Sequence, residues 1–281
     1  MGILQRAGCF LFAGLVGAVV PLSAQAAGPV NWQMGLRDAA SPTMEKIVDF
    51  HNLLMVIITL VTVFVLVLLL YVMYRFSEKR NPTPSKTTHN TLIEVLWTAV
   101  PVIILVVVAI PSFKLLYFAD RVEDAEMTIK AIGRQWYWSY EYPDHGNFTF
   151  DATLVDAEDL EEGQKRLLET DNYIVLPVNT KIRLLITASD VLHAFALPAM
   201  GIKLDAVPGR INETWIEITR EGTFYGQCSE ICGTGHSYMP IAVKAVSKEA
   251  FGQWVEEAKE EFARVDEPGT DSRLAQAPQA Q

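Results

Sequence analysis

The sequence from Leu53 to Tyr74 reads LLMVIITLVTVFVLVLLLYVMY, 22 residues without a charged side chain. At 1.5 Å per residue, a helix of this length spans about 33 Å, which matches the hydrocarbon core of a bilayer. A helix buried in the core of a soluble protein would be shorter and would carry a polar face. The segment therefore predicts a membrane-spanning helix over about residues 50–75.

A second apolar segment runs from Val95 to Phe113, 19 residues without a charge. It contains Pro101 and Pro111, which would break a helix in water. In a membrane, neighbouring helices can satisfy the carbonyl groups that proline leaves free. We expect a second spanning helix over about residues 92–118, so that residues 27–119 hold an N-terminal segment and a transmembrane α-helical hairpin.

The connection between the two segments is basic, with Arg75-Phe-Ser-Glu-Lys-Arg80 followed by Lys86. Loops rich in Lys and Arg stay on the cytoplasmic side of a membrane. The connection is therefore expected in the cytoplasm. The outer ends of both helices, and the chain beyond residue 120, are expected on the opposite side.

The N-terminus has the three parts of a secretory signal peptide. Arg6 supplies the positive charge, Cys9 to Val20 form the apolar run, and Ala24-Gln-Ala26 places small residues where a signal peptidase needs them. An uncleaved anchor is the alternative, but the apolar run is short and contains glycines. We predict that residues 1–26 are a signal peptide cleaved after Ala26, in agreement with the predicted orientation.

Charge is distributed unevenly along the 281 residues, whose formal net charge is -10. Residues 1–119 carry 8 basic and 5 acidic side chains, whereas residues 120–281 carry 15 basic and 28 acidic, a net charge of -13. The hydrophobic share of 50% excludes a disordered protein, and the acidic balance argues against nucleic acid as a partner. Three cysteines are too few for a disulfide framework. The external part therefore suits a cationic partner.

From Glu126 onward the apolar residues alternate, which is typical of strands. Short alternating or apolar segments between Gly, Pro and Asn turns predict an all-β sandwich or barrel over residues 120–265. These segments cover residues 127–132, 148–150, 173–178, 182–186, 215–219 and 241–246. Ala157 to Glu169 is an acidic insertion of helix-favouring composition, and Lys248 to Val265 predicts a terminal amphipathic helix. The Ala, Gln and Pro content of residues 266–281 predicts a disordered or processed tail.

Potential metal ligands are concentrated in Gly226–Pro240, which reads GQCSEICGTGHSYMP. Two cysteines, a histidine and a methionine fall within 12 residues: Cys228, Cys232, His236 and Met239. Thiolate, imidazole and thioether together suit copper better than zinc, calcium or magnesium. A second imidazole must come from elsewhere, and His193 is the best candidate, at the end of a predicted strand 35 residues before Cys228.

Two other interpretations of this stretch remain open. In an oxidising compartment Cys228 and Cys232 could form a disulfide. Zinc also accepts two cysteines and two histidines, although zinc fingers usually place the two histidines as a close pair. The presence of His236 and Met239 beside the cysteines favours copper over both.

These residues resemble the dinuclear copper (CuA) motif of subunit II of haem-copper cytochrome c oxidases, and in particular its bacterial members. The resemblance covers nearly all of the chain after the signal peptide. The motifs that carry it are Gln135-Trp-Tyr-Trp-Ser-Tyr-Glu141, Asp190-Val-Leu-His193, Asp205-Ala-Val-Pro-Gly-Arg210, Gly226-Gln-Cys-Ser-Glu-Ile-Cys232 and Glu94 to Trp97. The resemblance implies a cupredoxin-like Greek-key β-barrel, two helices in a bacterial inner membrane, and a periplasmic copper domain.

The resemblance also implies roles for single residues. Cys228 and Cys232 would bridge two copper ions, and His193 and His236 would each complete one of them. Met239 and the backbone carbonyl of Glu230 would be weak ligands, one to each ion. The Glu230 side chain would point toward a magnesium ion shared with subunit I. This chain would hold no haem, since the haems and the reduction of dioxygen to water, coupled to proton pumping, would belong to subunit I.

Partner contacts follow from the same resemblance. Trp136 would be the point at which electrons enter from cytochrome c, whereas the other aromatic residues nearby are expected to serve in packing. Acidic side chains would attract the basic face of cytochrome c: Glu141, Asp171 and Asp190, with Asp144 and Asp151 as further candidates. Glu94, at the cytoplasmic end of the second helix, would stand at the entrance of a proton pathway. From the residues alone, Glu94 could equally be an interfacial carboxylate.

Three other kinds of protein are alternatives to the oxidase subunit. A membrane-tethered copper carrier or assembly protein would bind metal without turnover, and would not need Trp136, a docking surface or Glu94. A quinol oxidase subunit would lack the copper ligands. A fused cytochrome c would require Cys-x-x-Cys-His, which the sequence does not contain.

Overall fold

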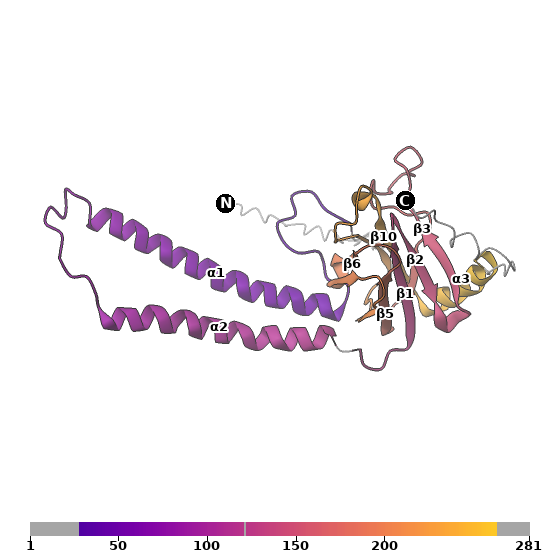
Figure 1. Cartoon of the computed structure of the whole chain (residues 1–281), viewed down its shortest axis with the longest axis horizontal. Helices are drawn as coiled ribbons and strands as arrows, with labels where there is room; N and C mark the ends of the chain where they lie inside the picture. The colour runs from indigo at the N-terminus through magenta and orange to yellow at the C-terminus, as the bar shows by residue number, and fades with distance from the viewer. Residues whose placement is uncertain (1–27, 121, 263–281) are drawn as a thin grey trace, which may run out of the picture.

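The computed structural model describes residues 28–120 and 122–262. Two long helices form an antiparallel hairpin that extends from one side of a β-domain (Figure 1). They are α1, Pro42–Arg75, and α2, Thr91–Asp120. The predicted signal peptide (1–26) and tail (266–281) lie outside the described residues, and the predicted domain boundaries there remain predictions.

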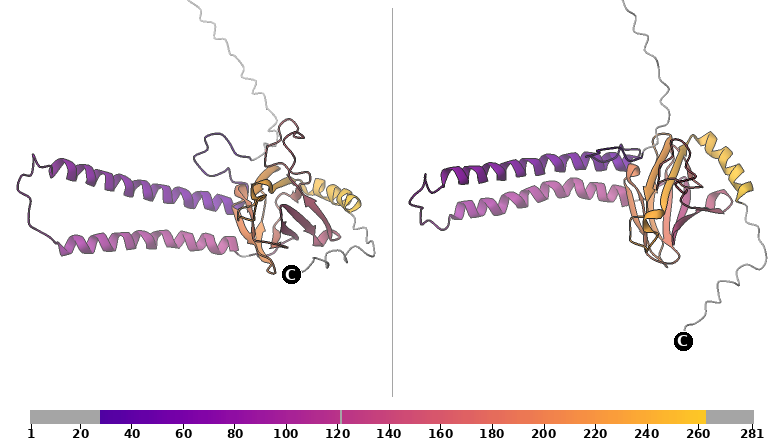
Figure 2. Two further views of the ribbon diagram at one scale, coloured as in Figure 1. Left: turned by 45° about the horizontal axis from the view of Figure 1, so that its top comes forward. Right: turned by 90° about the horizontal axis from the view of Figure 1, so that it is seen from above.

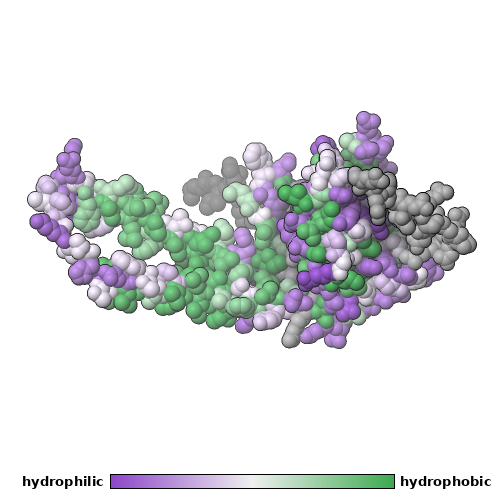
Figure 3. All heavy atoms as spheres, in the orientation of Figure 1, coloured by the Kyte–Doolittle hydropathy of each residue, from purple (hydrophilic) through white to green (hydrophobic). Residues whose placement is uncertain are grey.

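Apolar side chains cover both helices over most of their length, as the green surface in Figure 3 shows. Both helices are long and apolar enough to cross a membrane, and their apolar windows are not buried within the chain. A soluble helix would hide such a surface in a core. The hairpin therefore confirms the predicted pair of membrane-spanning helices.

The first helix begins at Pro42, earlier than the predicted start near residue 50. Ser41 is its N-cap, because the Ser41 hydroxyl accepts a hydrogen bond from the Met44 N–H at 3.0 Å, and Pro42 occupies the first helical position. The apolar run marks only the part of the helix that lies in the membrane. The polar turns that precede it are also helical.

The β-domain contains ten strands among the described residues, arranged in three sheets. Five strands form one sheet in the order β3-β2-β1-β5-β8, three form a second in the order β4-β10-β9, and β6 pairs with β7. Their bounds are β1 Met127–Arg134, β2 Tyr137–Tyr142, β3 Phe148–Ala152, β4 Ile174–Pro177, β5 Ile182–Ala188, β6 His193–Leu197, β7 Ile202–Ala206, β8 Asn212–Ile216, β9 Gly222–Gln227 and β10 Pro240–Val246. The pairs β1–β5 and β4–β10 are parallel and the others are antiparallel.

The hydrophobic core lies between these sheets. Along β1, residues Met127, Ile129 and Ala131 are buried while their neighbours are partly exposed, as the alternating pattern predicted. Large side chains from other strands fill the interior, among them Trp138, Tyr140, Phe195 and Phe224. The result confirms an all-β domain and is consistent with the predicted cupredoxin-like fold.

Several elements differ from the sequence-based expectation. Strands β2, β6, β7 and β9 are not among the predicted segments, and β8 ends at Ile216 where a strand over residues 215–219 was expected. His193 begins β6, whereas the prediction placed it at the end of a strand. The terminal helix α3, Lys248–Glu261, is confirmed with an earlier end, and it packs Phe251 and Val255 against the domain.

The insertion over residues 157–169 forms turns, so the expected helical character is wrong. The buried Glu169 carboxylate accepts hydrogen bonds from the hydroxyl groups of Tyr173 and Tyr225, the second at 3.0 Å. A bridge between Leu154 and Thr170 closes the base of the insertion. These tertiary contacts override a local helix propensity that is worth only tenths of a kcal/mol, roughly, per residue.

The membrane hairpin is joined to the β-domain through the residues before α1. Buried Ala40 donates from its N–H to the carbonyl of Ala199 at 2.9 Å, and its own carbonyl accepts from the Thr219 N–H at 3.0 Å. The Ser41 hydroxyl donates to the Met200 carbonyl at 2.7 Å. The hairpin therefore contacts the short turn (Pro198–Met200) that directly follows β6 (Figure 2).

Candidate metal centre

The candidate metal ligands come from two neighbouring strand ends. His193 is the first residue of β6, and Cys228 directly follows β9. The loop from Cys228 to Met239 is closed at its base, because the Cys228 N–H donates to the Met239 carbonyl at 3.2 Å. The Ser229 N–H donates to the Ala194 carbonyl at 3.0 Å, which ties this loop to β6 beside His193.

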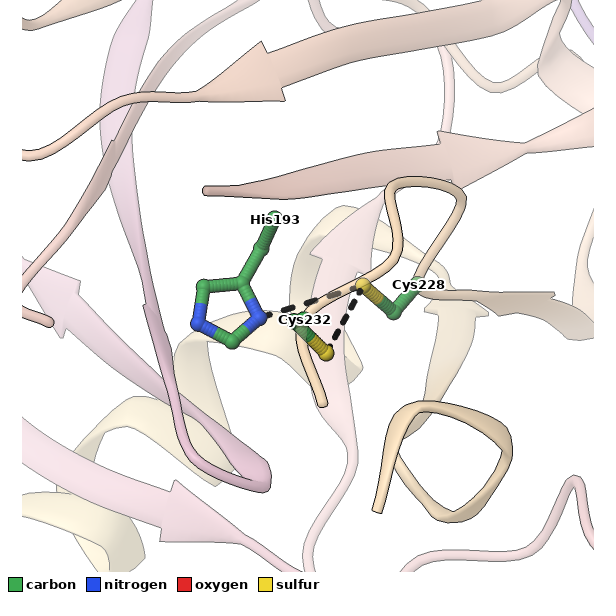
Figure 4. Close-up of side chains that lie close together, drawn as sticks. All are labelled: His193, Cys228 and Cys232. Atoms are coloured by element: carbon green, nitrogen blue, oxygen red, sulfur yellow. Dashed lines mark hydrogen bonds between the residues drawn. The ribbon is translucent and has the colours of Figure 1, made fainter. Parts of the chain in front are cut away.

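The side chains of His193, Cys228 and Cys232 converge on one point, as Figure 4 shows. Their ligand atoms all lie within 4.8 Å of one another. The two Sγ atoms are 3.9 Å apart, far longer than the ~2.05 Å of a disulfide, so the two thiols are free. The disulfide interpretation of Cys228 and Cys232 is therefore excluded for this structure.

Each sulfur has its own imidazole. Nδ1 of His193 lies 3.9 Å from Sγ of Cys228, and Nδ1 of His236 lies 3.6 Å from Sγ of Cys232. Sδ of Met239 lies 3.5 Å from Sγ of Cys232, whereas the carbonyl oxygen of Glu230 lies 3.3 Å from Sγ of Cys228. The structure thus brings together every residue that the sequence proposed for the metal centre, with one weak donor on each side.

The interior of this cluster is shielded from water. His193, Cys228, Cys232 and Met239 are buried, and His236 is half-buried. Soft sulfur and imidazole donors in a closed site fit copper, whereas hard cations prefer oxygen ligands. The donor set and its burial therefore fit a copper site made by the residues of this chain.

The two thiols differ in acidity. Burial raises the pKa of the Cys228 thiol, but hydrogen bonds from His193 and the Ala194 backbone outweigh burial and lower the pKa to about 6. Burial and the neighbouring Cys228 raise the pKa of Cys232 to about 12. One thiolate thus forms readily and keeps the other thiol protonated. A metal that binds both sulfurs must displace that second proton.

Asp190 supports His193 from behind. Its Oδ1 lies 2.9 Å from Nε2 of His193, and its Oδ2 accepts from the Gln135 N–H at 2.7 Å. Burial of Asp190 raises its pKa, but the hydrogen bonds from His193, Val191 and Gln135 outweigh burial and hold the pKa below its usual range. A carboxylate in this position fixes the tautomer and orientation of a ligating imidazole.

The turn between β1 and β2 also contacts the loop from Cys228 to Met239, which we call the copper loop. The side-chain amide of Gln135 and the indole N–H of Trp136 both donate to the Cys232 carbonyl, at 2.9 Å and 3.1 Å. Trp136 is 37% exposed, whereas Trp138, in β2, is fully buried with its ring 6.0 Å from that of His193. The sequence-based division between an accessible Trp136 and packing aromatics agrees with this placement.

Sequence reasoning missed two features of this site. Asp190 was expected only as a docking acid, although its position three residues before His193 was a signal for a supporting role. Gly133 was not singled out, yet a β-carbon there would lie 2.8 Å from the His193 ring. No local pattern could reveal that contact, because β1 and β6 are separated by more than 50 residues.

The other expected docking acids take part in contacts within the domain. Glu141 forms an ion pair with Lys130 at 3.0 Å, and Asp171 accepts from the N–H and hydroxyl of Thr153 at 2.7 Å and 2.8 Å. Of the two further candidates, Asp144 accepts from the Thr128 N–H at 2.7 Å, and Asp151 accepts from the Ser139 hydroxyl. These carboxylates therefore make hydrogen bonds or ion pairs that join neighbouring segments of the β-domain surface.

Glu94 and the Glu230 side chain lie apart from the cluster of sulfur and nitrogen donors. Glu94 is in the first turn of α2, at the end of the hairpin far from the β-domain, and it accepts from the Asn90 N–H at 3.2 Å (Figure 1). The Glu230 side chain is exposed, although its carbonyl is near Cys228. Neither side chain is brought to the sulfur cluster, and the roles expected for them remain predictions.

Comparison with known proteins covers both parts of the chain. The family described as cytochrome c oxidase subunit II, periplasmic domain, matches residues 127–246, and the corresponding transmembrane domain family matches residues 29–115. A probable cytochrome c oxidase subunit 2 of Rickettsia bellii is 49% identical over 250 residues, 89% of this chain and 91% of that relative. The cytochrome c oxidase subunit 2 of Arabidopsis thaliana is 51% identical over 80% of this chain and 88% of that relative.

A solved structure resembles the β-domain in sequence. The periplasmic domain of subunit II of cytochrome oxidase from Bradyrhizobium japonicum is 54% identical to this chain, covering 51% of it and 100% of the solved domain, with a TM-score of 0.48.

Proposed function

Because this chain belongs to the cytochrome c oxidase subunit II family, we propose that it binds two copper ions in the cluster around Cys228 and Cys232, and that these accept electrons from a cytochrome c. The chain is a membrane-anchored subunit of a haem-copper oxidase. Its contribution to the enzyme is electron transfer, since the reduction of dioxygen takes place in subunit I.

In the proposed centre, the Cys228 and Cys232 thiolates would hold both coppers, His193 and His236 would each add one imidazole ligand, and Met239 and the Glu230 carbonyl would be weak donors. When bound, such a copper pair takes up and releases one electron that is shared between the two ions. The chain supplies a closed pocket that excludes water from the sulfurs. Asp190 holds the His193 imidazole in place, and the hydrogen bond from the Cys228 N–H to the Met239 carbonyl closes the base of the loop.

One observation carries the proposal: two free thiols lie 3.9 Å apart, each with its own imidazole nitrogen within 4 Å. A site for one metal would place both imidazoles around a single point. Here the His193 imidazole lies next to Cys228, and the His236 imidazole lies next to Cys232. The test is copper quantification with electron paramagnetic resonance on the purified oxidase. We expect two coppers in this subunit sharing one unpaired electron, seen as a multi-line hyperfine pattern. A single-copper spectrum, or zinc, would falsify the dinuclear assignment.

For electron entry we propose that cytochrome c docks over Trp136, whose indole is partly exposed and hydrogen-bonded to Cys232. The support for a cationic partner is the net charge of -13 beyond residue 119. In this proposal Glu141, Asp171 and Asp190 add to the negative field at long range. Their internal contacts leave that charge in place.

For the remaining assignments we propose that the exposed Glu230 side chain faces subunit I and shares a magnesium ion with it. Its support is the exposure of the side chain, while the carbonyl of the same residue lies 3.3 Å from Sγ of Cys228. The β-domain would be periplasmic in a bacterial inner membrane, with both termini periplasmic and the basic connection over residues 76–90 cytoplasmic. A metal analysis of the oxidase with Glu230→Gln tests the magnesium assignment, because only magnesium should be lost.

Glu94 lies at the proposed cytoplasmic end of the hairpin, where we propose that it admits protons to a pathway in subunit I. Proton pumping by the complex depends on such an entrance, which would make this subunit part of the proton-translocating machinery. We expect Glu94→Gln to slow turnover while leaving the copper spectrum unchanged. Unaltered turnover would leave Glu94 with only the capping contact to Asn90.

A further inference from the structure

Trp136 is held flat against the copper loop by its own hydrogen bond. Its indole N–H and the Gln135 amide both donate to the Cys232 carbonyl. A carbonyl has two lone pairs, so both bonds can form together. These bonds therefore give the indole one defined position. The indole can take that position only if the backbone and side chains of the loop from Cys228 to Met239 leave space for the ring.

Two glycines of the loop lie against this ring. A β-carbon on Gly235 would lie 2.4 Å from both Cγ and Cδ2 of Trp136, and one on Gly233 would lie 3.0 Å from Cζ2. Non-bonded carbon atoms prefer separations of about 3.5–4.0 Å. A β-carbon at Gly235 therefore requires the Trp136 ring to shift from this position.

The two glycines differ in their backbones. Gly233 has φ 117°, a conformation that L side chains rarely adopt, and this explains glycine there without reference to Trp136. Gly235 has φ -87° and ψ 10°, a sparsely populated region that other residues nevertheless adopt in turns. Its backbone thus gives Gly235 no reason to be glycine. The remaining structural reason for glycine at position 235 is its contact with the Trp136 indole.

We propose that Gly235 is a positioning residue for electron entry, because its missing side chain lets the Trp136 indole lie against the copper loop and bond to Cys232. The inference rests on the proposed role of Trp136 as the entry point. It adds a second residue to that role, on a different part of the chain and without redox chemistry of its own.

The first test is Gly235→Ala in the complete oxidase. The added methyl group displaces the ring, so the rate of electron transfer from reduced cytochrome c to copper should fall severalfold below that of the control variant. The copper content and the electron paramagnetic resonance spectrum should not change. Gly252→Ala is the matched control, since no atom lies within 4 Å of a β-carbon there.

A double-mutant cycle with Trp136→Ala separates the ring from other causes. In the Trp136→Ala background, Gly235→Ala should change neither the rate of electron entry nor the midpoint of thermal unfolding of the β-domain. If Gly235→Ala alone prevents assembly of the oxidase, then the double variant should restore assembly. An equal effect of Gly235→Ala in both backgrounds would overturn the inference.

The outcomes also separate the inference from the proposed function. If Trp136→Ala leaves electron entry unchanged, then the entry role of Trp136 fails. If Trp136→Ala slows entry but Gly235→Ala has the rate of the Gly252→Ala control, then the entry role stands and the inference about Gly235 is wrong.

Discussion

Cys228 and Cys232 are the residues at which the proposed site is most sensitive to substitution, because their sulfurs lie 3.9 Å apart and each is next to one imidazole. Cys228→Ser should abolish the multi-line electron paramagnetic resonance signal, since a hydroxyl is a poor bridging ligand for copper. Met239→Leu should keep the signal and slow electron transfer only mildly, because Met239 is a buried, weak donor of similar volume to Leu. A Cys228→Ser protein that keeps the multi-line spectrum would contradict the bridging role.

Asp190 offers a second prediction at this scale. Replacing Asp190 with Asn removes a negative charge beside His193 while keeping a hydrogen-bonding group of the same shape. Negative charge near a metal favours its oxidised form, so the reduction potential of the copper centre should rise in Asp190→Asn. A redox titration of the copper absorption measures this.

Asp144→Asn is the matched control for Asp190, because Asp144 also accepts a backbone N–H but lies away from the ligands. An unchanged potential in Asp190→Asn, together with weaker binding of cytochrome c, would assign Asp190 to docking alone.

At the scale of elements, the start of α1 joins the membrane hairpin to the β-domain. Ser41→Ala removes both the N-cap bond to Met44 and the bond to the Met200 carbonyl. Loss of an N-cap costs about 1 kcal/mol, and the buried Met200 carbonyl loses a partner as well. Thermal unfolding of the β-domain should therefore shift downward. Ser85→Ala, in the exposed connection, should leave the midpoint unchanged, and an equal midpoint for both variants would contradict a joining role for Ser41.

The insertion over residues 157–169 is held in place by hydrogen bonds from Tyr173 and Tyr225 to Glu169. Burial and the Glu169 carboxylate raise the pKa of both Tyr173 and Tyr225 above the ordinary value. A group with a raised pKa in the folded state stabilises below its unfolded pKa, and that stability is lost as the pH rises. The free energy of unfolding should therefore fall above about pH 10.

Urea denaturation between pH 8 and pH 11, roughly the range around the tyrosine pKa, measures this effect. The Tyr225→Phe variant should be less stable at pH 8 and should lose less stability at high pH, because it has one fewer hydroxyl to ionise. The same pH dependence in both proteins would show that the pair with Glu169 does not contribute.

An element could be predicted from the sequence where a local pattern of residues specifies it, and could not where tertiary contacts do. Strand β1 alternates between core and surface, so its pattern was readable, whereas all five residues of β6 are buried and carry no alternation. The helix propensity of residues 157–169 was real but was overridden by the contacts of Glu169. The copper ligands were found because Cys, His and Met are informative as residue types. The contact between Trp136 and the loop around Cys232 joins residues 96 positions apart, and no local pattern shows it.

For the whole molecule, the decisive property is the separation of an apolar anchor from an acidic external domain. The net charge of -13 beyond residue 119 should steer a basic cytochrome c toward the domain, and salt screens that attraction within about 10 Å at 0.1 M. The second-order rate constant for cytochrome c should therefore fall as ionic strength rises. Stopped-flow measurements at increasing salt test this, and a rate that does not depend on salt would remove the docking assignment.

The two backbone hydrogen bonds of Ala40 have a geometric consequence. A copper domain on a loose tether would sample many heights and tilts above the bilayer. Here the N–H and the carbonyl of Ala40 reach Ala199 and Thr219, and Ala199 lies two residues beyond β6, whose first residue is His193. A five-residue strand is about 16 Å long, so the copper site stands one strand length from the anchor. The length of β6 therefore sets the distance between the membrane hairpin and the metal ligands that begin at His193.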